Sequence, residues 1–398
     1  MQQIDLFSCR SICFFMGNNM CMEKLFNKNY IFTVISATLF YTASFMLNTV
    51  SARYSLQLGA GKTVAGFVAA VFTLASFFTR PVWGYITDKK GRKRVYNAGG
   101  LLCLASTAIL LFCNNVILLF VSRIIYGAGY SALTTAGGTI ICDVVPEKQL
   151  SKAVSLYGIT NVLSQAVAPA AALWLFDKGF IWVAVVAVIV MAAVLITALF
   201  VKYNEKQYIN PDIPFRIIEK SALPAAYTII FFAMSTASIN SFIPVMAQER
   251  EINVDKWFFI VSAALLLMAR FVNTKLTDRY GSNNIFCKAD ILYCIAFVII
   301  AFSYSPFMLL TGAALYGLGA GFIHPIVNTA AVSRCSSEKR GLATGTFMMS
   351  QDLGMTIGAA TWGVISETIG FTAVYIMVAA LLLVMLWIFK KVLAPLLE

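Results

Sequence analysis

The sequence contains very little charge. Only 12% of its 398 residues are charged, whereas 60% are hydrophobic and the mean hydropathy is +0.80. Soluble domains carry about 25% charged residues, so a soluble fold of this composition is excluded. Apolar runs of about 17–25 residues, each long enough to cross a bilayer as a helix, recur throughout. The composition therefore predicts an all-α polytopic membrane protein.

Several kinds of chemistry lack the residues that they need. His324 is the only histidine, and none of the nine cysteines belongs to a CxxC motif. We therefore expect no metal site, no disulfide framework and no cofactor. The sequence also lacks an ATP-binding loop of the form GxxxxGK[ST], an HExxH motif and a nucleophile elbow. A transport activity would therefore have to draw its energy from a gradient, and an enzyme is disfavoured.

Twelve apolar runs are candidate transmembrane helices. Their ranges are 30–50, 63–83, 95–113, 116–142, 153–175, 180–201, 223–246, 256–274, 289–303, 308–333, 342–365 and 371–389. The ninth is short, and we expect it to extend at one end.

The basic residues are distributed unequally between the two sides of these runs. If the runs alternate in direction, 23 of the 30 Lys and Arg residues lie on the side of the N-terminus and five on the other. Short cytoplasmic loops are enriched in Lys and Arg. Both termini are therefore predicted to be cytoplasmic, in a multi-pass protein of the cell membrane. This bias accounts for the net charge of +12 without a nucleic-acid partner.

The chain repeats itself at an offset of 190 residues. The segment RPVWGYITDKKGRKR, residues 80–94, has a reduced copy, and a second repeat follows in spans four and ten. The matching pairs are Arg80 and Arg270, Asp88 and Asp278, Gly91 and Gly281, Tyr126 and Tyr316, Gly127 and Gly317, and Gly129 and Gly319. Such parallel repeats predict two pseudo-symmetric six-helix halves with a binding site between them.

The predicted division of the chain follows from these halves. Residues 30–201 form the first half, 202–222 a cytoplasmic linker and 223–389 the second half. Residues 1–29 and 390–398 form cytoplasmic segments at the two ends. The first residues lack a signal-peptide pattern, and Met20 or Met22 is a candidate start of the natural chain.

Two motifs resemble signatures of the major facilitator superfamily. The loop between spans two and three fits G-x-x-x-D-[RK]-x-G-[RK]-[RK], with Gly84, Asp88, Gly91 and Arg92 among the matching residues. Span four fits R-x-x-x-G-x-G, beginning at Arg123 and continuing with the glycine pair at 127 and 129. The resemblance implies that two halves rock against each other to move a small solute. We expect a monomer whose partners are this solute, protons and the lipid bilayer.

The direction of transport stays open at this stage. Span five holds Pro169 in a partial match to a signature of proton-coupled exporters, with small residues in place of its glycines. Together with the second half, which resembles bacterial efflux permeases, this favours proton-coupled efflux by antiport. The alternatives are uptake of a sugar, organic acid or peptide by proton symport and, more distantly, a membrane sensor or a membrane-embedded enzyme.

The resemblance implies a conformational latch at the cytoplasmic end. The Asp88 carboxylate can accept hydrogen bonds from the N-terminus of span eleven and hold this end shut. Gly84 is expected to allow close helix approach, and Gly91 a tight turn. Arg92 is expected to pair with Asp143. In the second half, Asp278 and Gly281 provide a weaker copy, and Arg80 and Arg270 are expected to anchor the cytoplasmic interface.

Polar groups within the spans are candidates for the proton and solute pathway. Arg123 and Asp352 are the deepest charges, and His324 can also exchange a proton. Gln351 and Asn328 could add polar contacts. The alternatives are a snorkelling role for the arginine and helix packing for the others. The repeated glycines Gly127, Gly129, Gly317 and Gly319, with Pro169, are assigned to helix packing. Asp290 is expected to pair with Lys288 near the membrane surface.

Overall fold

Twelve long α-helices make up most of the described chain. The computed structural model describes residues 27–145, 150–202, 217–333 and 340–396. The long helices are α2 (Lys28–Gln57), α3 (Lys62–Lys90), α4 (Arg92–Leu110), α5 (Val116–Val144), α6 (Leu150–Phe176), α7 (Phe180–Leu199), α8 (Leu223–Glu249), α9 (Asp255–Tyr280), α10 (Ser282–Ala301), α11 (Pro306–Ser333), α12 (Arg340–Thr368) and α13 (Phe371–Ile388). Short helical turns, η3 (Lys220–Ala222), η5 (Phe389–Leu393) and η6 (Ala394–Leu396), flank the second half. The twelve predicted spans fall on these helices in order. The ninth extends at its N-terminal end, back to Ser282.

Local sequence signals set several helix ends. The side chains of Asn27 and Asn115 accept hydrogen bonds from the first turns of α2 and α5, at 2.8 Å each. Gly91 separates α3 from α4 with φ of 108°, and Gly281 separates α9 from α10 with φ of 80°. Positive φ is accessible to glycine at little cost, which explains its place at both hinges. Because the helices alternate in direction, the hinges at Gly91 and Gly281 lie at the same end of the molecule as the C-terminal turns η5 and η6. This end is called the basic end.

The two halves repeat their packing in detail. A Cβ built on Gly127 would lie 2.2 Å from the carbonyl oxygen of Phe72, and one on Gly317 would lie 2.0 Å from that of Ser262. Both glycines and both carbonyls are separated by 190 residues. Each glycine thus lets two helices approach within backbone contact, α5 on α3 and α11 on α9.

The second glycine of each pair shows the same correspondence. A Cβ on Gly129 would lie 2.6 Å from Cys103 Sγ, and a Cβ on Gly319 would lie 2.8 Å from Tyr293 Cβ. Cys103 and Tyr293 are again 190 positions apart. The repeat inferred from sequence therefore describes equivalent helix contacts in space.

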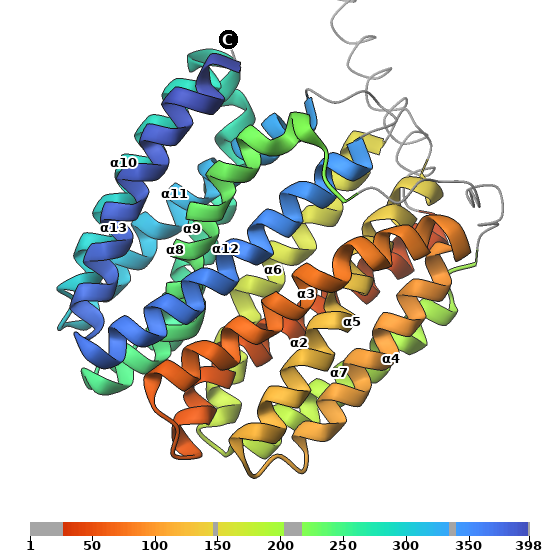
Figure 1. The fold of residues 1–398 in the computed structure, drawn as a ribbon, viewed down its shortest axis with the longest axis horizontal. Helices are drawn as coiled ribbons and strands as arrows, with labels where there is room; N and C mark the ends of the chain where they lie inside the picture. The colour runs from red at the N-terminus through yellow and green to blue at the C-terminus, as the bar shows by residue number, and fades with distance from the viewer. Residues whose placement is uncertain (1–26, 146–149, 203–216, 334–339, 397–398) are drawn as a thin grey trace, which may run out of the picture.

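Two helix pairs form the main junction between the halves. The helices α3 and α12 pack together along their length, and α6 packs on α9 (Figure 1). These two pairs are equivalent under the repeat, because α9 is the copy of α3 and α12 is the copy of α6. Contacts between α2 and α8 add to the junction.

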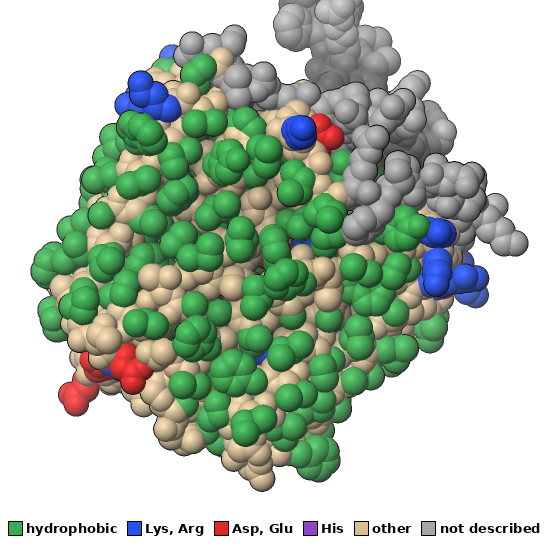
Figure 2. Space-filling model, viewed as in Figure 1, with side chains coloured by type: hydrophobic (Ala, Val, Ile, Leu, Met, Phe, Trp, Pro, Cys, Tyr) green, Lys and Arg blue, Asp and Glu red, His purple; other side chains and the backbone are tan. Residues whose placement is uncertain are grey.

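The surface fits a protein embedded in lipid. Hydrophobic side chains cover the face in Figure 2, and Lys, Arg, Asp and Glu gather towards its ends. Ten of the described helices are long and apolar enough to cross a membrane by length and composition. The other two long helices are α4, which starts with Arg92-Lys93-Arg94, and α12, which carries Gln351 and Asp352. Their polar residues reduce the hydropathy of otherwise continuous spans.

The packing corrects the role expected of Gly84. A Cβ at this position would meet no atom within 4 Å, so the glycine does not mediate close helix approach in this structure. Pro169 is buried within α6, between the buried Ala168 and Ala170.

Candidate functional site

A buried ion pair joins the two halves between α3 and α12. Arg80 donates from Nη2 and Nε to Asp352 Oδ2, at 2.7 and 2.9 Å. The two residues are 5% and 8% exposed. Arg80 was expected to anchor the cytoplasmic interface, but its side chain instead lies inside the bundle. Nearly three helical turns separate it from the end of α3 at Lys90, which explains the difference.

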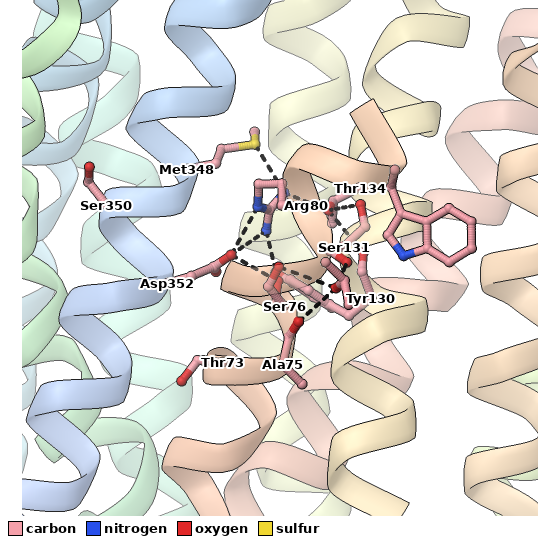
Figure 3. A network of polar contacts seen from close by, with 12 residues as sticks. Thr73, Ala75, Ser76, Arg80, Tyr130, Ser131, Thr134, Met348, Ser350 and Asp352 are labelled. Carbon is pink, nitrogen blue, oxygen red and sulfur yellow. Dashed lines mark hydrogen bonds and ion pairs between the residues drawn. The ribbon is translucent and has the colours of Figure 1, made fainter. Parts of the chain in front are cut away.

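Polar groups from three helices surround this pair (Figure 3). Ser76 donates to Asp352 Oδ2 at 2.8 Å and accepts from Arg80 Nη2 at 3.1 Å. Arg80 Nη1 donates to Thr134 Oγ1 on α5 at 3.0 Å, and Met348 Sδ lies 3.6 Å from the same nitrogen. The charges are thus enclosed by hydrogen bonds, as a buried ion pair requires.

Further contacts tie α3 to α12 towards the end of the molecule opposite the basic end. Thr73 and Thr356 share a hydrogen bond of 2.8 Å. A Cβ on Gly66 would lie 2.4 Å from the carbonyl oxygen of Ala359 and 2.8 Å from Gly363 Cα. The two helices therefore touch through their backbones near this end.

At the opposite end, one hydrogen bond and two ion pairs join the two halves. The Glu367 carboxylate accepts from the backbone N–H of Thr63 at 2.7 Å, in the first turn of α3, where anions are stabilised. Lys62 Nζ lies 2.5 Å from Glu249 Oε2. The third contact is the ion pair of Lys256 on α9 with Asp177, which follows α6. These ties hold the two halves together at the opposite end.

The basic end contains the residues of the predicted latch. Arg92 Nε lies 2.9 Å from Asp143 Oδ2, so this expected pair is present. The Asp88 side chain is 41% exposed and lies 4.0 Å from Arg92 Nη2, within its own half. Among the residues that the structure describes, no hydrogen bond or ion pair joins Asp88 to the start of α12. Within the described residues, the latch contact is therefore not formed in the arrangement in which the opposite end carries polar contacts between the halves.

The copy of this hinge in the second half is more open. Asp278 is exposed at the end of α9, and Gly281 provides the turn into α10. Within the described ranges, Asp278 forms no ion pair comparable to that of Arg92 with Asp143.

Arg123 lies inside the first half. It is 1% exposed, and Nη2 donates to Asn48 Oδ1 on α2. Its guanidinium lies 4.4 Å from the centre of the Phe72 ring and 5.9 Å from that of Tyr126. Nε and Nη1 are buried without a hydrogen-bond partner in the described part of the chain. A snorkelling role is excluded, because the side chain does not reach the surface.

His324 belongs to a separate cluster in the second half. Its ring lies between Phe232 and Phe347, with centroids 5.9 and 5.7 Å away. The Gln351 amide interacts with it from α12, and Arg270 is close enough to act on it electrostatically. His324 and Asp352 therefore lie on two sides of α12 rather than in one continuous relay. Asn328, one turn beyond His324, is half-buried.

The expected pair of Asp290 with Lys288 is not formed. Asp290 is fully buried on α10, whereas Lys288 is exposed, so the expected pair does not form. Both carboxylate oxygens of Asp290 are buried without a partner among the described residues. An acid two positions from a lysine lies on another face of a helix, a signal that the spacing already contained. The partnership of Arg80 with Asp352 has no such signal, because it joins distant segments.

The described residues contain no cluster of three or more His, Cys, Asp or Glu side chains that could hold a metal ion. The five cysteines in this part of the chain, Cys103, Cys113, Cys142, Cys287 and Cys294, are free thiols. The polar chemistry of the interior therefore rests on arginine, carboxylate, imidazole, amide and hydroxyl groups.

Comparison with known proteins places these features in a wider group. The family model described as Major Facilitator Superfamily matches residues 33–287 and 225–396. The chain is 22% identical over 381 residues to the staphylopine export protein of Staphylococcus aureus (strain Mu50 / ATCC 700699), covering 91% of this chain and 94% of that protein.

Solved transporter structures share the fold. A POT family transporter in complex with a thioalcohol conjugated peptide superposes with a TM-score of 0.80 at 13% identity, covering 93% of this chain and 96% of the other. The nucleoside transporter NupG superposes with a TM-score of 0.69 at 16% identity, covering 92% and 100% of the two chains. At these identities the likeness concerns the arrangement of helices.

Proposed function

Because the chain belongs to the Major Facilitator Superfamily, we propose that it exports a small solute across the cell membrane in exchange for protons. The two six-helix halves rock about a central site, which opens alternately to each side. The gradient supplies the energy. The basic end faces the cytoplasm, in agreement with the distribution of Lys and Arg in the sequence.

The ion pair of Arg80 with Asp352 carries this proposal. It is buried at the junction that must rearrange when the halves rock, and one partner can bind a proton. A proton on Asp352 removes the charge that compensates Arg80, so the junction between α3 and α12 weakens. Loss of the proton restores the pair and favours the arrangement described here. Proton binding is thereby coupled to the position of the two halves.

The polar contacts at the opposite end support an assignment of the transporter's state. Three polar contacts and the close approach at Gly66 hold that end shut. At the basic end, Asp88 is partly exposed and paired within its own half. This combination supports a state closed towards the outside, in which the latch at Asp88 is released. The latch forms when the halves rock the other way.

The outward direction is supported by the similarity to the staphylopine export protein. The alternative is uptake by proton symport. Both directions can use the same ion pair, since coupling depends on which state binds the proton more tightly. Direction is therefore decided by experiment.

The purified protein in proteoliposomes provides this test. An imposed pH gradient and a pH-sensitive dye enclosed in the vesicles report proton movement as candidate solutes are added on one side. We expect solute-dependent proton flux for the wild type and its loss in Asp352→Asn. Glu251→Gln, which neutralises an exposed acid beyond α8, is the matched control. Undiminished proton flux in Asp352→Asn would remove the coupling role, and accumulation of solute against the outward direction would establish uptake.

A further inference from the structure

The internal repeat relates the site of the Arg80–Asp352 ion pair to an equivalent site at the second junction between the halves. The helices α6 and α9 pack together there, as α12 and α3 do at the first. The offset of 190 residues that relates the glycine contacts also relates the side chains around Arg80. It pairs Arg80 with Arg270, Thr134 with His324, Ser76 with Leu266, and Asp352 with Val162.

The arginine is retained at the second junction, but its partners are not. At the first, Asp352 and Ser76 satisfy the guanidinium of Arg80. At the second, both positions hold aliphatic residues, Leu266 and Val162, each buried. An arginine at this position therefore lacks the carboxylate that its copy possesses.

The surroundings of Arg270 agree with this comparison. Its Nε is buried without a hydrogen-bond partner, and no carboxylate pairs with it within the described ranges. One turn further along α9, Asn273 Oδ1 is also buried without a partner. An uncompensated arginine in a span is costly, and such residues usually face a partner or a site. In the described part of the chain, Arg270 Nε and Asn273 Oδ1, one turn apart on α9, thus both lack a hydrogen-bond partner.

Groups from two further helices converge on this position. A Cβ on Gly321 would lie 2.6 Å from Ala269 Cβ, which shows that α11 and α9 are in close contact directly before Arg270. His324 follows Gly321 on α11, and the Gln351 amide approaches its ring from α12. The aromatic rings of Phe232 and Phe347 flank the imidazole. The cluster thus combines a cation, two polar donors and apolar walls, as small-molecule sites do.

We propose that Arg270 binds a carboxylate of the transported solute, with His324 and Gln351 as neighbouring polar contacts. This inference rests on the proposed transport function. The solute carboxylate supplies to Arg270 the compensating charge that Asp352 supplies to Arg80 at the equivalent junction. The planar guanidinium fork matches a carboxylate in geometry as well as charge. The solute would therefore complete the second junction, whereas the first is completed by the protein itself.

Binding to the purified protein tests the carboxylate assignment. The probes are succinate, citrate, N-acetylalanine and alanylalanine, each compared with its methyl ester, and inorganic phosphate as a different anion. We expect a carboxylate to bind, its ester to bind at least about tenfold more weakly, and Arg270→Gln to cause a loss of the same size. Lys275→Gln, which removes an exposed charge from the same helix, should keep wild-type affinity. Equal binding to Arg270→Gln, binding of phosphate alone, or binding of none of the carboxylates would overturn the assignment.

A second measurement tests the geometry without any ligand. Val162→Asp places a carboxylate where the repeat predicts that Arg270 needs one. We expect this variant to keep a melting temperature near that of the wild type and to lose carboxylate binding. The double variant Val162→Asp with Arg270→Gln should melt well below it, because the new acid is then unpaired. Equal destabilisation by Val162→Asp with and without Arg270 would overturn the proposed junction.

The two proposals fail in different ways. Carboxylate binding that depends on Arg270, without gradient-driven flux in proteoliposomes, would contradict the transport function and leave the binding site in place. Proton-coupled flux that is unchanged in Arg270→Gln would contradict the binding site and leave the transport function in place.

Discussion

Arg80 and Asp352 lie 272 residues apart in the sequence and form a buried ion pair with donor–acceptor distances of 2.7 and 2.9 Å. The pair joins the second helix of one half to the fifth helix of the other. Because both side chains are enclosed, each depends on the other for compensation of its charge. This relationship places a protonatable group at the junction between the two halves.

The first prediction concerns the stability of this pair. Either Asp352→Leu or Arg80→Leu alone should destabilise the protein by about 3–5 kcal/mol, because the remaining charge is left uncompensated in the interior. The combined variant Arg80→Leu with Asp352→Leu should recover much of this loss while remaining inactive. Melting temperatures of the detergent-purified variants measure the effect. Additive losses in the double variant would show that the two residues do not act as a pair.

The second prediction concerns the latch. Asp88→Asn should insert and fold normally but turn over at least several-fold more slowly. The proposed latch would stabilise the N-terminus of α12 in the outward-facing state by about 1–2 kcal/mol, so its loss would lower the ratio of outward-facing to inward-facing molecules by about five- to thirtyfold. Transport in proteoliposomes measures turnover, and Lys90→Gln in the same loop is the control. Wild-type turnover in Asp88→Asn would refute the latch.

The third prediction uses the close approach of α3 and α12. Gly66→Val should prevent closure of the opposite end, since a Cβ at this position would lie 2.4 Å from the Ala359 carbonyl oxygen. Overpacking of this kind costs about 1–3 kcal/mol. We expect transport to be lost and labelling of an introduced Thr73→Cys thiol from the outside to increase.

Gly138→Ala is the matched control for this substitution, because no atom lies within 4 Å of a Cβ built there. It should leave transport unchanged. An active Gly66→Val variant would show that the backbone contact is not needed for the cycle.

The fourth prediction concerns Asp290, the fully buried acid of α10. Its oxygens have no partner among the described residues, and a buried unsatisfied polar group costs about 1–3 kcal/mol. Asp290→Leu should therefore raise the melting temperature, by about 2–4 °C for each kcal/mol recovered. Asp290→Asn should have a smaller effect, since the amide remains polar. A lower melting temperature in Asp290→Leu would show that the carboxylate is stabilised by an interaction in the folded protein.

Much of the architecture could be predicted from the sequence. Twelve apolar runs determined the helices, because a helix in lipid must satisfy its own backbone hydrogen bonds and present apolar side chains outward. The hinge at Gly91 and its copy at Gly281 followed from residue type, since a positive φ favours glycine. The pair of Arg92 with Asp143 was also predictable, because both residues lie at the same end of adjacent spans.

The candidate site was only partly predictable. Asp352, Arg123 and His324 were identified as interior polar groups, but their partners were not. From the sequence, Asp352 is a candidate proton carrier or solute contact, with a packing acid bound to neighbouring hydroxyls as the alternative. Arg80 is expected to anchor the cytoplasmic interface. Asp290 was assigned to the wrong neighbour, because its position on the buried face of α10 depends on packing against α11 and α13.

The sequence by itself determined the number of helices, the division into two repeated halves and the family. These properties depend on hydropathy, residue type and internal similarity, all of which can be read along one chain. Only the tertiary structure decided which charges meet across the halves and which end carries polar contacts between them. It also decided that Arg270, unlike Arg80, has no carboxylate partner among the described residues. Those relationships depend on helix rotation and contact between distant segments, which the order of residues does not specify directly.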